Sequence, residues 1–465
     1  MADLIAPWLT ASIGIPLAAA AVSRLPGTQR HARTIAVLAC TASLMLSLET
    51  VRELIGAGWT TMSEPWVPVL FSADALNAVT MALFAALALV TLISAPRRDI
   101  DGKPVSTILM LTAGTLAAYA ADNPMVFLAG WIGSLLPFLL GTRDKAAERR
   151  SVLELAASAV FLAVAVILHT SGASGIYAFT FLVLAAILRT GLFPFHRVAV
   201  SRFENGSLLP AGLLMNTHLG VFLIVRFGVP LFPAVAQTAL PWLGTLALFT
   251  TIYTAVLGTV EREPRRLLAL IFVSQSSAIL AGLVIARPEG TMGALVQWIV
   301  LGVTSTVMIS ICRCIEVRID QPLAGERLLG LAAQMPRLAV FFVVSALALV
   351  GLPGTLGFPG EDLLVHGVLS AHPLIGIVLP VAIAINAYHL YRLFARLFLG
   401  TPVTAWNGAP DALPRERWPF SACLVILVWG GLMPSQVVAL RSTAADLLAT
   451  LTSTAALQKV VDRKP

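Results

Sequence analysis

Charged residues are scarce in this sequence. Only 12% of the 465 residues are charged, whereas 58% are hydrophobic. Soluble globular domains carry about 25% charged residues, so this composition excludes a soluble globular protein. We expect a multi-pass protein of the cell's inner (plasma) membrane.

Cysteine is rare as well, and its spacing excludes a common class of metal site. Cys312 and Cys314 are two positions apart, which is too close for the Cys-x-x-Cys spacing of a metal knuckle. Cys40 and Cys423 stand alone in or beside apolar segments, as small packing residues do. We therefore expect no metal, no cofactor and no catalytic centre in this chain. Any chemistry would belong to a partner protein.

Lysine is the third scarce residue. The chain has four, and all lie in a loop or in the C-terminal tail: Lys103, Lys145, Lys459 and Lys464. Burial can shift a lysine so that it takes up and releases protons. A proton path built on buried lysines is therefore excluded.

Long apolar runs take the place of charge. Fourteen of them are long enough to cross about 30 Å of hydrocarbon. They are residues 3–22, 34–50, 73–95, 104–121, 124–141, 152–170, 174–191, 208–227, 240–260, 265–286, 291–312, 335–358 (continued by a half-helix over 361–370), 374–398 and 418–440. We predict an all-α polytopic fold with about 14 transmembrane helices.

The basic residues predict an orientation. They gather in every second loop, at residues 24–33, 97–103, 143–150, 197–202, 261–266, 318–327 and 415–417. The positive-inside rule places these loops in the cytoplasm and both termini on the outer side. Because Ala2 and Asp3 open the first span in place of a basic segment, we expect no cleaved signal peptide.

One apolar run is interrupted in its middle. Residues 351–360 carry a Gly at every third position and two prolines, and each Gly costs roughly 1 kcal/mol and each Pro roughly 3 kcal/mol in a helix interior. We therefore predict a helix break, followed at once by Glu361 and Asp362. Broken helices with an acid at membrane depth form ion paths. The alternative is a tight re-entrant loop at the membrane surface.

A second break is predicted between the seventh and eighth spans. Gly191 and Pro194 interrupt the chain there, beside Arg189 and His196. The two breaks lie five spans apart, and an odd offset inverts orientation, as in an inverted repeat. We divide the single membrane domain, 1–465, into N-terminal helices (1–103), a first inverted repeat (104–227), a second (240–398) and a C-terminal helix with a tail (399–465).

Four motifs in this order resemble one family. Residues 193–196 (Phe-Pro-Phe-His), 211–216, 263–269 and 353–361 are similar to motifs of the antiporter-like membrane subunits of respiratory complex I. The subunit M branch is the most similar. Relatives occur in membrane hydrogenases, cation/proton antiporters and inorganic-carbon accumulation complexes. The resemblance runs from about residue 70 to 440 and implies two inverted five-helix repeats, broken helices 7 and 12, and proton movement along buried Glu, Lys and His.

The sequence departs from the family at most of those buried residues. The family's glutamate in the fifth helix falls on Ile132, and its lysines in the seventh and eighth helices fall on Arg189 and Asn216. Its His and Lys of the eleventh helix fall near Leu301 and Ser305. An arginine stays protonated in proteins and an asparagine does not titrate. Of the buried titratable series, Glu361 alone remains.

We name nine candidates for a proton path or a coupling role: Glu361, Arg189, His389, Asn216, His218, His196, Glu263, Arg265 and Asp362. Burial of Glu361 is expected among Leu352, Leu356 and Phe358. Asp362 points about 100° away from Glu361 on a helix and is expected to cap that helix or to face outward.

Two histidines need comparison as relay candidates. His218 lies about 200° round a regular helix from Asn216, so it does not simply replace a lysine there. His389 is the better candidate, because Arg392 follows at helical spacing on the same face.

The resemblance implies an antiporter-like, proton-conducting or energy-coupling subunit of a multi-subunit complex. Two kinds of complex stay open: an inorganic-carbon uptake complex with a cytoplasmic carbonic-anhydrase-like partner, and a complex I or hydrogenase type of quinone oxidoreductase with a redox partner. The alternative is a non-conducting scaffold with a degenerate ion path. Other subunits, the lipid bilayer and protons are the expected partners, and nucleic acid is not.

Overall fold

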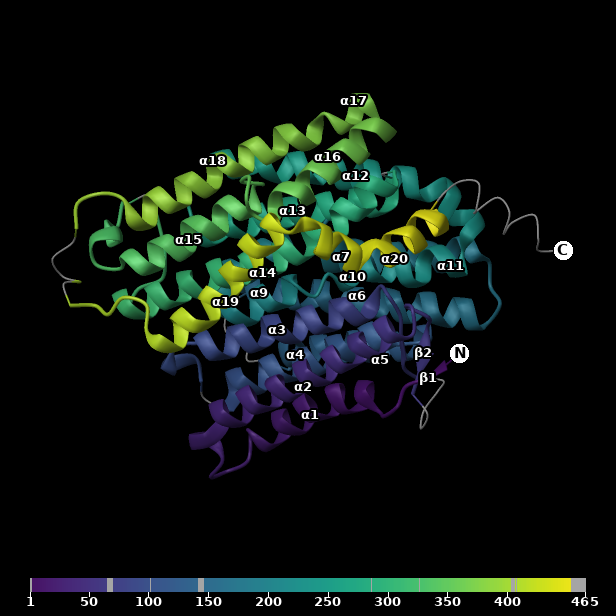
Figure 1. Cartoon of the computed structure of the whole chain (residues 1–465), viewed down its shortest axis with the longest axis horizontal. Helices are drawn as coiled ribbons and strands as arrows, with labels where there is room; N and C mark the ends of the chain where they lie inside the picture. Colours follow the sequence, from purple (N-terminus) through teal and green to yellow (C-terminus); the bar gives the residue numbers. More distant parts are fainter. Residues whose placement is uncertain are drawn as a thin grey trace. The chain divides into compact units, whose positions relative to one another are not determined.

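The computed structural model describes residues 2–64, 70–100, 102–140, 146–285, 287–325, 327–402, 406 and 408–452. Most of these residues are helical (Figure 1). The predictions for residues 143–145 and for the tail beyond 452 lie outside this part of the chain. The structure is that of an all-helical, multi-pass membrane protein.

The helices up to the first predicted break are α1 (Trp8–Val22), α2 (Ala32–Gly56), α3 (Asn77–Ser94), α4 (Gly102–Ala120), α5 (Pro124–Leu139), α6 (Ala146–Thr170) and α7 (Gly175–Thr190). Short 3-10 turns cover Gln29–His31 and Arg97–Asp99. Three strands of two residues each, β1 (Ala2–Asp3), β2 (Met62–Ser63) and β3 (Ser72–Ala73), form a small sheet. In it β1 pairs parallel with β2, and β2 pairs antiparallel with β3.

After that break the chain forms α8 (Arg197–Asn205), α9 (Leu208–Met215), α10 (Leu219–Leu223), a π-helical turn (Ile224–Gly228), α11 (Val229–Leu231), α12 (Pro233–Val260), α13 (Pro264–Ile285) and α14 (Pro288–Ile319). A 3-10 turn at Leu331–Ala333 precedes α15 (Pro336–Leu349), α16 (Gly357–Ala371), α17 (Pro373–Gly376), α18 (Val378–Phe398), α19 (Pro414–Leu432) and α20 (Pro434–Thr452).

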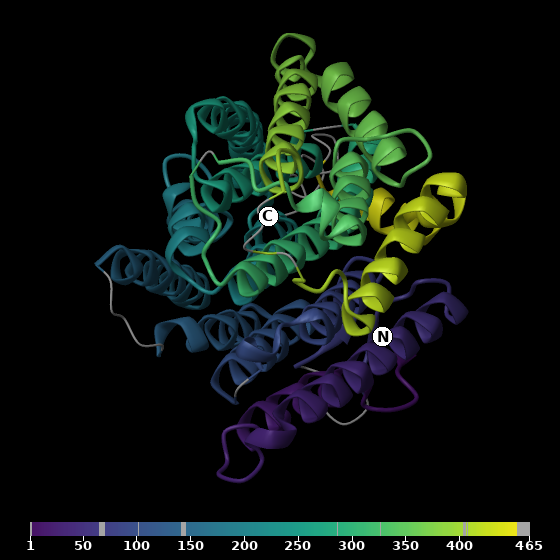
Figure 2. The same cartoon turned by 90° about the vertical axis from the view of Figure 1, so that its left-hand side faces the viewer.

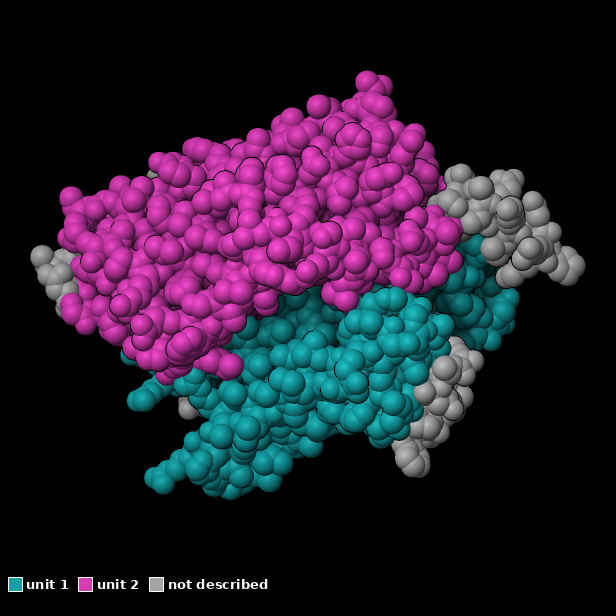
Figure 3. Space-filling model, in the orientation of Figure 1, with its two compact units in different colours: residues 1–92, 97–189, 216–236 teal, residues 93–96, 190–215, 237–465 magenta. Residues whose placement is uncertain are grey.

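The chain divides into two compact units (Figure 3). Unit 1 holds Met1–Leu92, Arg97–Arg189 and Asn216–Ala236, and unit 2 holds Ile93–Pro96, Thr190–Met215 and Gln237–Pro465. In unit 1, α1 and α2 run side by side in both views (Figures 1 and 2).

Length and composition identify eight membrane spans among the described residues, or nine if the bent pair α19 and α20 is one span. Four further apolar helices are shorter: α1, α5, α7 and α15. The fourteen predicted crossings are therefore not all matched by helices long enough to span. The shortfall has a local cause at the break in the twelfth span, because α15 ends at Leu349 and not at the predicted residue 358.

Small residues allow the closest helix contacts. A Cβ at Gly293 would collide with the backbone of Leu364, and a Cβ at Gly367 would collide with the backbone of Gly290. These glycines let α14 and α16 approach through their backbones, as small residues do in membrane proteins. The same contacts position α16, which carries Glu361, against α14.

Two elements differ from the prediction. The eighth span, expected as one helix over 208–227, is interrupted at Asn216 and Thr217, and His218 has a φ of 42°. The last span, expected over 418–440, ends at Leu432, and α20 leaves it at 88°. A Cβ at Gly431 would collide with the backbone of Thr355, so the bend occurs where α19 meets the loop between α15 and α16.

Candidate functional site

The break in the twelfth span lies between α15 and α16. Gly351 and Gly354 have φ values of 70° and 89°, a region that costs little for glycine alone. Gly357 begins α16, and a Cβ there would collide with the carbonyl oxygen of Ala348. The amide of Leu356 donates to the carbonyl of Leu427 in α19, at 2.7 Å. The glycines thus form the break, and α19 fixes its loop.

Glu361 lies within this break. Its side chain is 7% exposed, and a Cβ at Gly351 would collide with its Oε2. Its Oε1 has no hydrogen-bond partner within the described part of the chain. The glycine at 351 therefore provides the space that the carboxyl group occupies.

The surroundings of Glu361 differ from the expectation in two respects. The half-helix begins at Gly357, not at Glu361, so Glu361 lies one turn inside the helix and away from its free N–H groups. Pro359 is tolerated in the first turn because those N–H groups have no helical partner. Leu352 and Phe358 are 41% and 47% exposed, so of the three expected neighbours only Leu356 is buried.

Asp362 is exposed.

One turn of α14 faces the same break, and Gln297 is fully buried on it. Our sequence reasoning missed Gln297, although a glutamine in the middle of an apolar run of the eleventh span was a visible signal.

His389 is fully buried on α18, and its Nε2 lies 2.7 Å from the carbonyl oxygen of Ala255 in α12. Arg392, one turn on, donates to the carbonyls of Gly258 and Thr259, each at 2.9 Å. The two side chains share a face, as the spacing predicted, and both contact the last turn of α12. Arg392 there supplies donors to carbonyls that have no partner within the helix.

The break after α7 is filled by aromatic rings. Gly191 has a φ of 73°, and the amide of Phe193 donates to Thr250 Oγ1 at 3.1 Å. His196 is buried, with its ring centroid 6.3 Å from that of Phe193 and 5.1 Å from that of Tyr253. His196 therefore lies in an aromatic cluster of unit 2.

Arg189 ends α7 in unit 1. Its guanidinium donates to Ser134 Oγ at 2.9 Å and lies 5.1 Å from the ring centre of Trp131. Ile132, the position onto which the family's glutamate falls, is 38% exposed. The α5 side chains that contact Arg189 are therefore Trp131 and Ser134, not the side chain at 132.

Asn216, Thr217 and His218 are all buried at the interruption of the eighth span. The hydroxyl of Tyr119 donates to the carbonyl of Thr217. The expected angle of 200° between residues 216 and 218 was wrong, because His218 adopts the left-handed conformation and leaves the helical path.

Arg265 and Arg318 each form a buried ion pair with a glutamate. Arg265 Nε lies 2.6 Å from Oε1 of Glu316, and Arg318 lies 2.6 Å from Glu416. Arg265 also donates to the carbonyl of Phe203 at 3.3 Å, near the end of α8. Sequence reasoning missed both glutamates. Glu316 was missed because the eleventh span was expected to end at residue 312, whereas α14 continues to Ile319.

Glu263 precedes α13 and accepts from the amide of Gly325 at 3.3 Å. A further ion pair, Asp74 with Arg226, occurs in unit 1. Asp74 also accepts from the amide of Asn77 at 3.0 Å and so caps the start of the third span.

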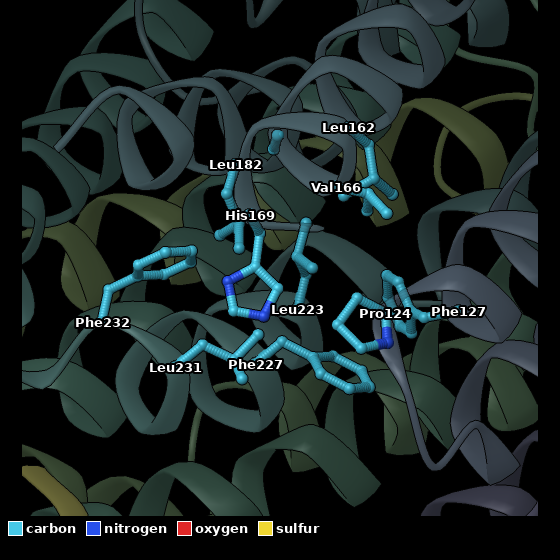
Figure 4. Close-up of a pocket in the computed structure, with 11 residues that line it drawn as sticks. Pro124, Phe127, Leu162, Val166, His169, Leu182, Leu223, Phe227, Leu231 and Phe232 are labelled. Atoms are coloured by element: carbon cyan, nitrogen blue, oxygen red, sulfur yellow. The ribbon is translucent and has the colours of Figure 1, made fainter. Parts of the chain in front are cut away.

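Unit 1 contains a small apolar pocket (Figure 4). Its lining includes Phe127, Leu182, Phe227 and Phe232, and His169 is its polar side chain. None of the nine candidate residues lines it. Among the described residues, no three His, Cys, Asp or Glu side chains are grouped as metal ligands would be.

Residues 152–386 match the family described as NADH:quinone oxidoreductase/Mrp antiporter, transmembrane. The chain belongs to this family. The predicted resemblance is thereby confirmed.

Relatives within the family match over different lengths. Subunit M of NADH-quinone oxidoreductase from Rickettsia conorii is 25% identical over 57% of this chain and 54% of its own length, so the match spans about half of that relative. A second relative, named NAD(P)H-quinone oxidoreductase chain 4 1, comes from Synechococcus elongatus. It is 24% identical over 94% of this chain and 91% of its own length. A chain of respiratory complex I from Thermus thermophilus, solved with bound NADH, has the same fold. It gives a TM-score of 0.82 at 24% identity and covers 96% of this chain and 100% of its own.

This member of the NADH:quinone oxidoreductase/Mrp antiporter family has no ionisable side chain along most of two central helices. None occurs from Leu267 to the end of α13, and none from Gly290 to Ile311 in α14. Leu301 and Ser305 are both buried there. Serine, threonine and glutamine supply the polar groups instead, and these can form hydrogen bonds but do not store a proton.

Proposed function

We propose that this chain is an antiporter-like, proton-conducting or energy-coupling subunit of a multi-subunit membrane complex. It would use the proton gradient to drive a partner subunit. In this proposal the chain crosses the membrane fourteen times, with two inverted repeats and both termini outside. Membership of the family supports the proposal, and the details rest on the residues discussed below.

The burial of Glu361 is the observation that carries the proposal. A carboxyl group at membrane depth is costly, and such groups mark ion and proton pathways. Glu361 lies at a helix break, close to the backbone of Gly351, with Oε1 unpaired within the described chain. A fixed structural acid would be expected to accept from an arginine, as Glu316 does from Arg265. Glu361 has the surroundings of a group that exchanges its proton.

We infer the kind of complex from the residue types in the central helices, α13 and α14. A proton pump that relays along buried lysines and histidines needs ionisable groups in α13 and α14. The stretches Leu267–Ile285 and Gly290–Ile311 of these helices carry none. We therefore favour an inorganic-carbon or bicarbonate uptake complex, with a cytoplasmic carbonic-anhydrase-like partner, over a complex I or hydrogenase type of proton pump. Mass spectrometry of what co-purifies with the tagged chain in mild detergent tests this choice: a redox subunit in place of a carbonic-anhydrase-like one would reverse it.

A non-conducting scaffold is the second candidate. The ion pairs Asp74–Arg226, Arg265–Glu316 and Arg318–Glu416 hold buried charges in fixed places, as a structural subunit requires. The two candidates differ in what they require of Glu361.

Glu361→Gln is the decisive test. Glutamine has nearly the same size but cannot exchange a proton, so the complex should assemble while its proton-dependent uptake is lost. Asp362→Asn is the matched control, because Asp362 is the exposed neighbour on the same helix. Uptake and proton flux are measured for both variants in the reconstituted complex at equal expression. Full activity of Glu361→Gln would place the scaffold first.

The proposed orientation has a separate test. A single cysteine introduced by Ala147→Cys should react with an impermeant thiol reagent only when the reagent reaches the cytoplasmic side, because the neighbouring loop is basic. Labelling of this cysteine from outside intact cells would reverse the orientation.

A further inference from the structure

The side chain of Gln297 bridges the two halves of the broken twelfth span. Its Nε2 donates to the carbonyl of Leu349, the last residue of α15, at 3.4 Å. Its Oε1 lies on the other side of the break, 3.1 Å from where a Cβ of Gly360 would be, in the first turn of α16. The amide thus places its donor at the carbonyl end of one helix and its acceptor at the amide end of the next, in agreement with the two helix dipoles.

Two oxygen atoms at this break have no partner within the described residues. They are Oε1 of Gln297 and Oε1 of Glu361. Both side chains are buried, and Glu361 directly follows Gly360, the residue that Gln297 approaches. A buried acceptor without a donor is destabilising. A protonated carboxyl group has one O–H to donate, and an amide oxygen accepts it.

We propose that Gln297 is a positioning residue for Glu361, whose protonated carboxyl donates a hydrogen bond to the amide oxygen of Gln297. The inference rests on the proposed function, because it gives the proton-carrying state of Glu361 a specific partner. The proton stays on Glu361, and the amide keeps both of its own hydrogens, so no charge is created on Gln297. When Glu361 loses the proton, two acceptors face the break and the hydrogen bond is lost. Protonation of Glu361 therefore adds a hydrogen bond between α14 and α16, and deprotonation removes it, while the glycine contacts between the two helices remain.

The glycines of the break agree with this arrangement. A Cβ at 351 would occupy the place of the Glu361 carboxyl group, and a Cβ at 360 would press on the amide oxygen of Gln297. Glycine at both positions keeps open the space in which the two groups meet.

Infrared difference spectroscopy of the full-length protein tests the hydrogen bond directly. The C=O band of protonated Glu361 is assigned by its loss in Glu361→Gln. In Gln297→Met, which keeps the length of the side chain but removes the acceptor, this band should move to higher frequency. Gln275→Met is the matched control, because Gln275 is a second buried glutamine in unit 2, on α13, with an amide nitrogen unpaired within the described chain. It should leave the band unchanged.

A second variant guards against misfolding. Gly360→Ala changes no polar group but displaces the amide oxygen of Gln297, so it should shift the same band in the same direction.

Proton flux should fall about tenfold in Gln297→Met, a factor that corresponds to about 1.4 kcal/mol. An unshifted band in Gln297→Met overturns the inference, and so does an equal shift in Gln275→Met.

The outcomes separate this inference from the proposed function. An unshifted band together with lost flux in Glu361→Gln would reject the role of Gln297 and keep that of Glu361. A shifted band together with full flux in Glu361→Gln would keep the hydrogen bond and reject the proton path.

Discussion

Two helix breaks in unit 2 contain the same residue types. The packing around the ionisable side chain differs between the two breaks. After α7, the rings of Phe193 and Tyr253 lie against His196. Between α15 and α16, the backbone of Gly351 lies against the carboxyl group of Glu361. The first break is packed by aromatic rings, and the second leaves space for a polar group. A broken helix with a nearby ionisable residue is therefore not by itself an ion site; the packing around the residue decides.

The half-helices that follow the breaks are also held differently. Near the end of α8, the carbonyl of Phe203 accepts from Arg265, which is paired with the buried Glu316. The loop before α16 is held by a backbone hydrogen bond from Leu356 to Leu427 and by glycine contacts. Buried ion pairs resist rearrangement because each charge depends on the other. We therefore expect the first break to be the rigid one and the second to respond to a change of charge on Glu361.

The largest effect is expected where the rigid break loses its ion pair. Arg265→Ala removes the shorter of two arginine contacts to the buried Glu316, since Arg313 lies 3.2 Å from it. Loss of a buried partner costs up to about 3–5 kcal/mol. Thermal unfolding in detergent measures the loss. Arg52→Ala is the control, because the pair of Arg52 with Glu49 is exposed and is worth about 0–1 kcal/mol. An equal loss in both variants would show that the first break does not depend on the buried pair.

The second break is tested by adding one methyl group at two positions. Gly351 and Gly354 both have positive φ, so Ala costs about 1–2 kcal/mol of backbone strain at either position. Only at 351 does the new Cβ collide with Glu361; at 354 it meets open space. Gly351→Ala should therefore reduce proton flux at least about tenfold below that of Gly354→Ala, about 1.4 kcal/mol in the barrier. Similar flux in the two variants would mean that the space around Glu361 is unimportant.

The smallest effect is expected at the aromatic break. His196→Gln keeps a polar side chain in the ring cluster, and flux should stay within about twofold of the wild type, equivalent to about 0.4 kcal/mol. The measurement is proton flux in the same reconstituted complex. A loss as large as that of Glu361→Gln would show that both breaks carry protons, and the contrast between them would no longer hold.

The sequence by itself determined the class of protein and the positions of the two breaks. Low charge and long apolar runs require a membrane protein, and the family assignment made from four motifs is confirmed by the match over residues 152–386. Gly and Pro disrupt helices through their own backbone chemistry, so breaks after α7 and α15 could be read from residues 191–194 and 351–359 without any partner.

Tertiary structure decided which side chains meet. Glu316 lies 51 positions from Arg265, and Gln297 lies 52 positions from Leu349, so no local pattern joins them. The interruption at Asn216 and Thr217 was also missed, because neither residue breaks helices as Gly or Pro does. Helix propensity acts within a few residues, whereas the partners of buried polar groups are chosen by how distant helices pack. The position of Glu361 was visible in the sequence, and its surroundings were set by the fold.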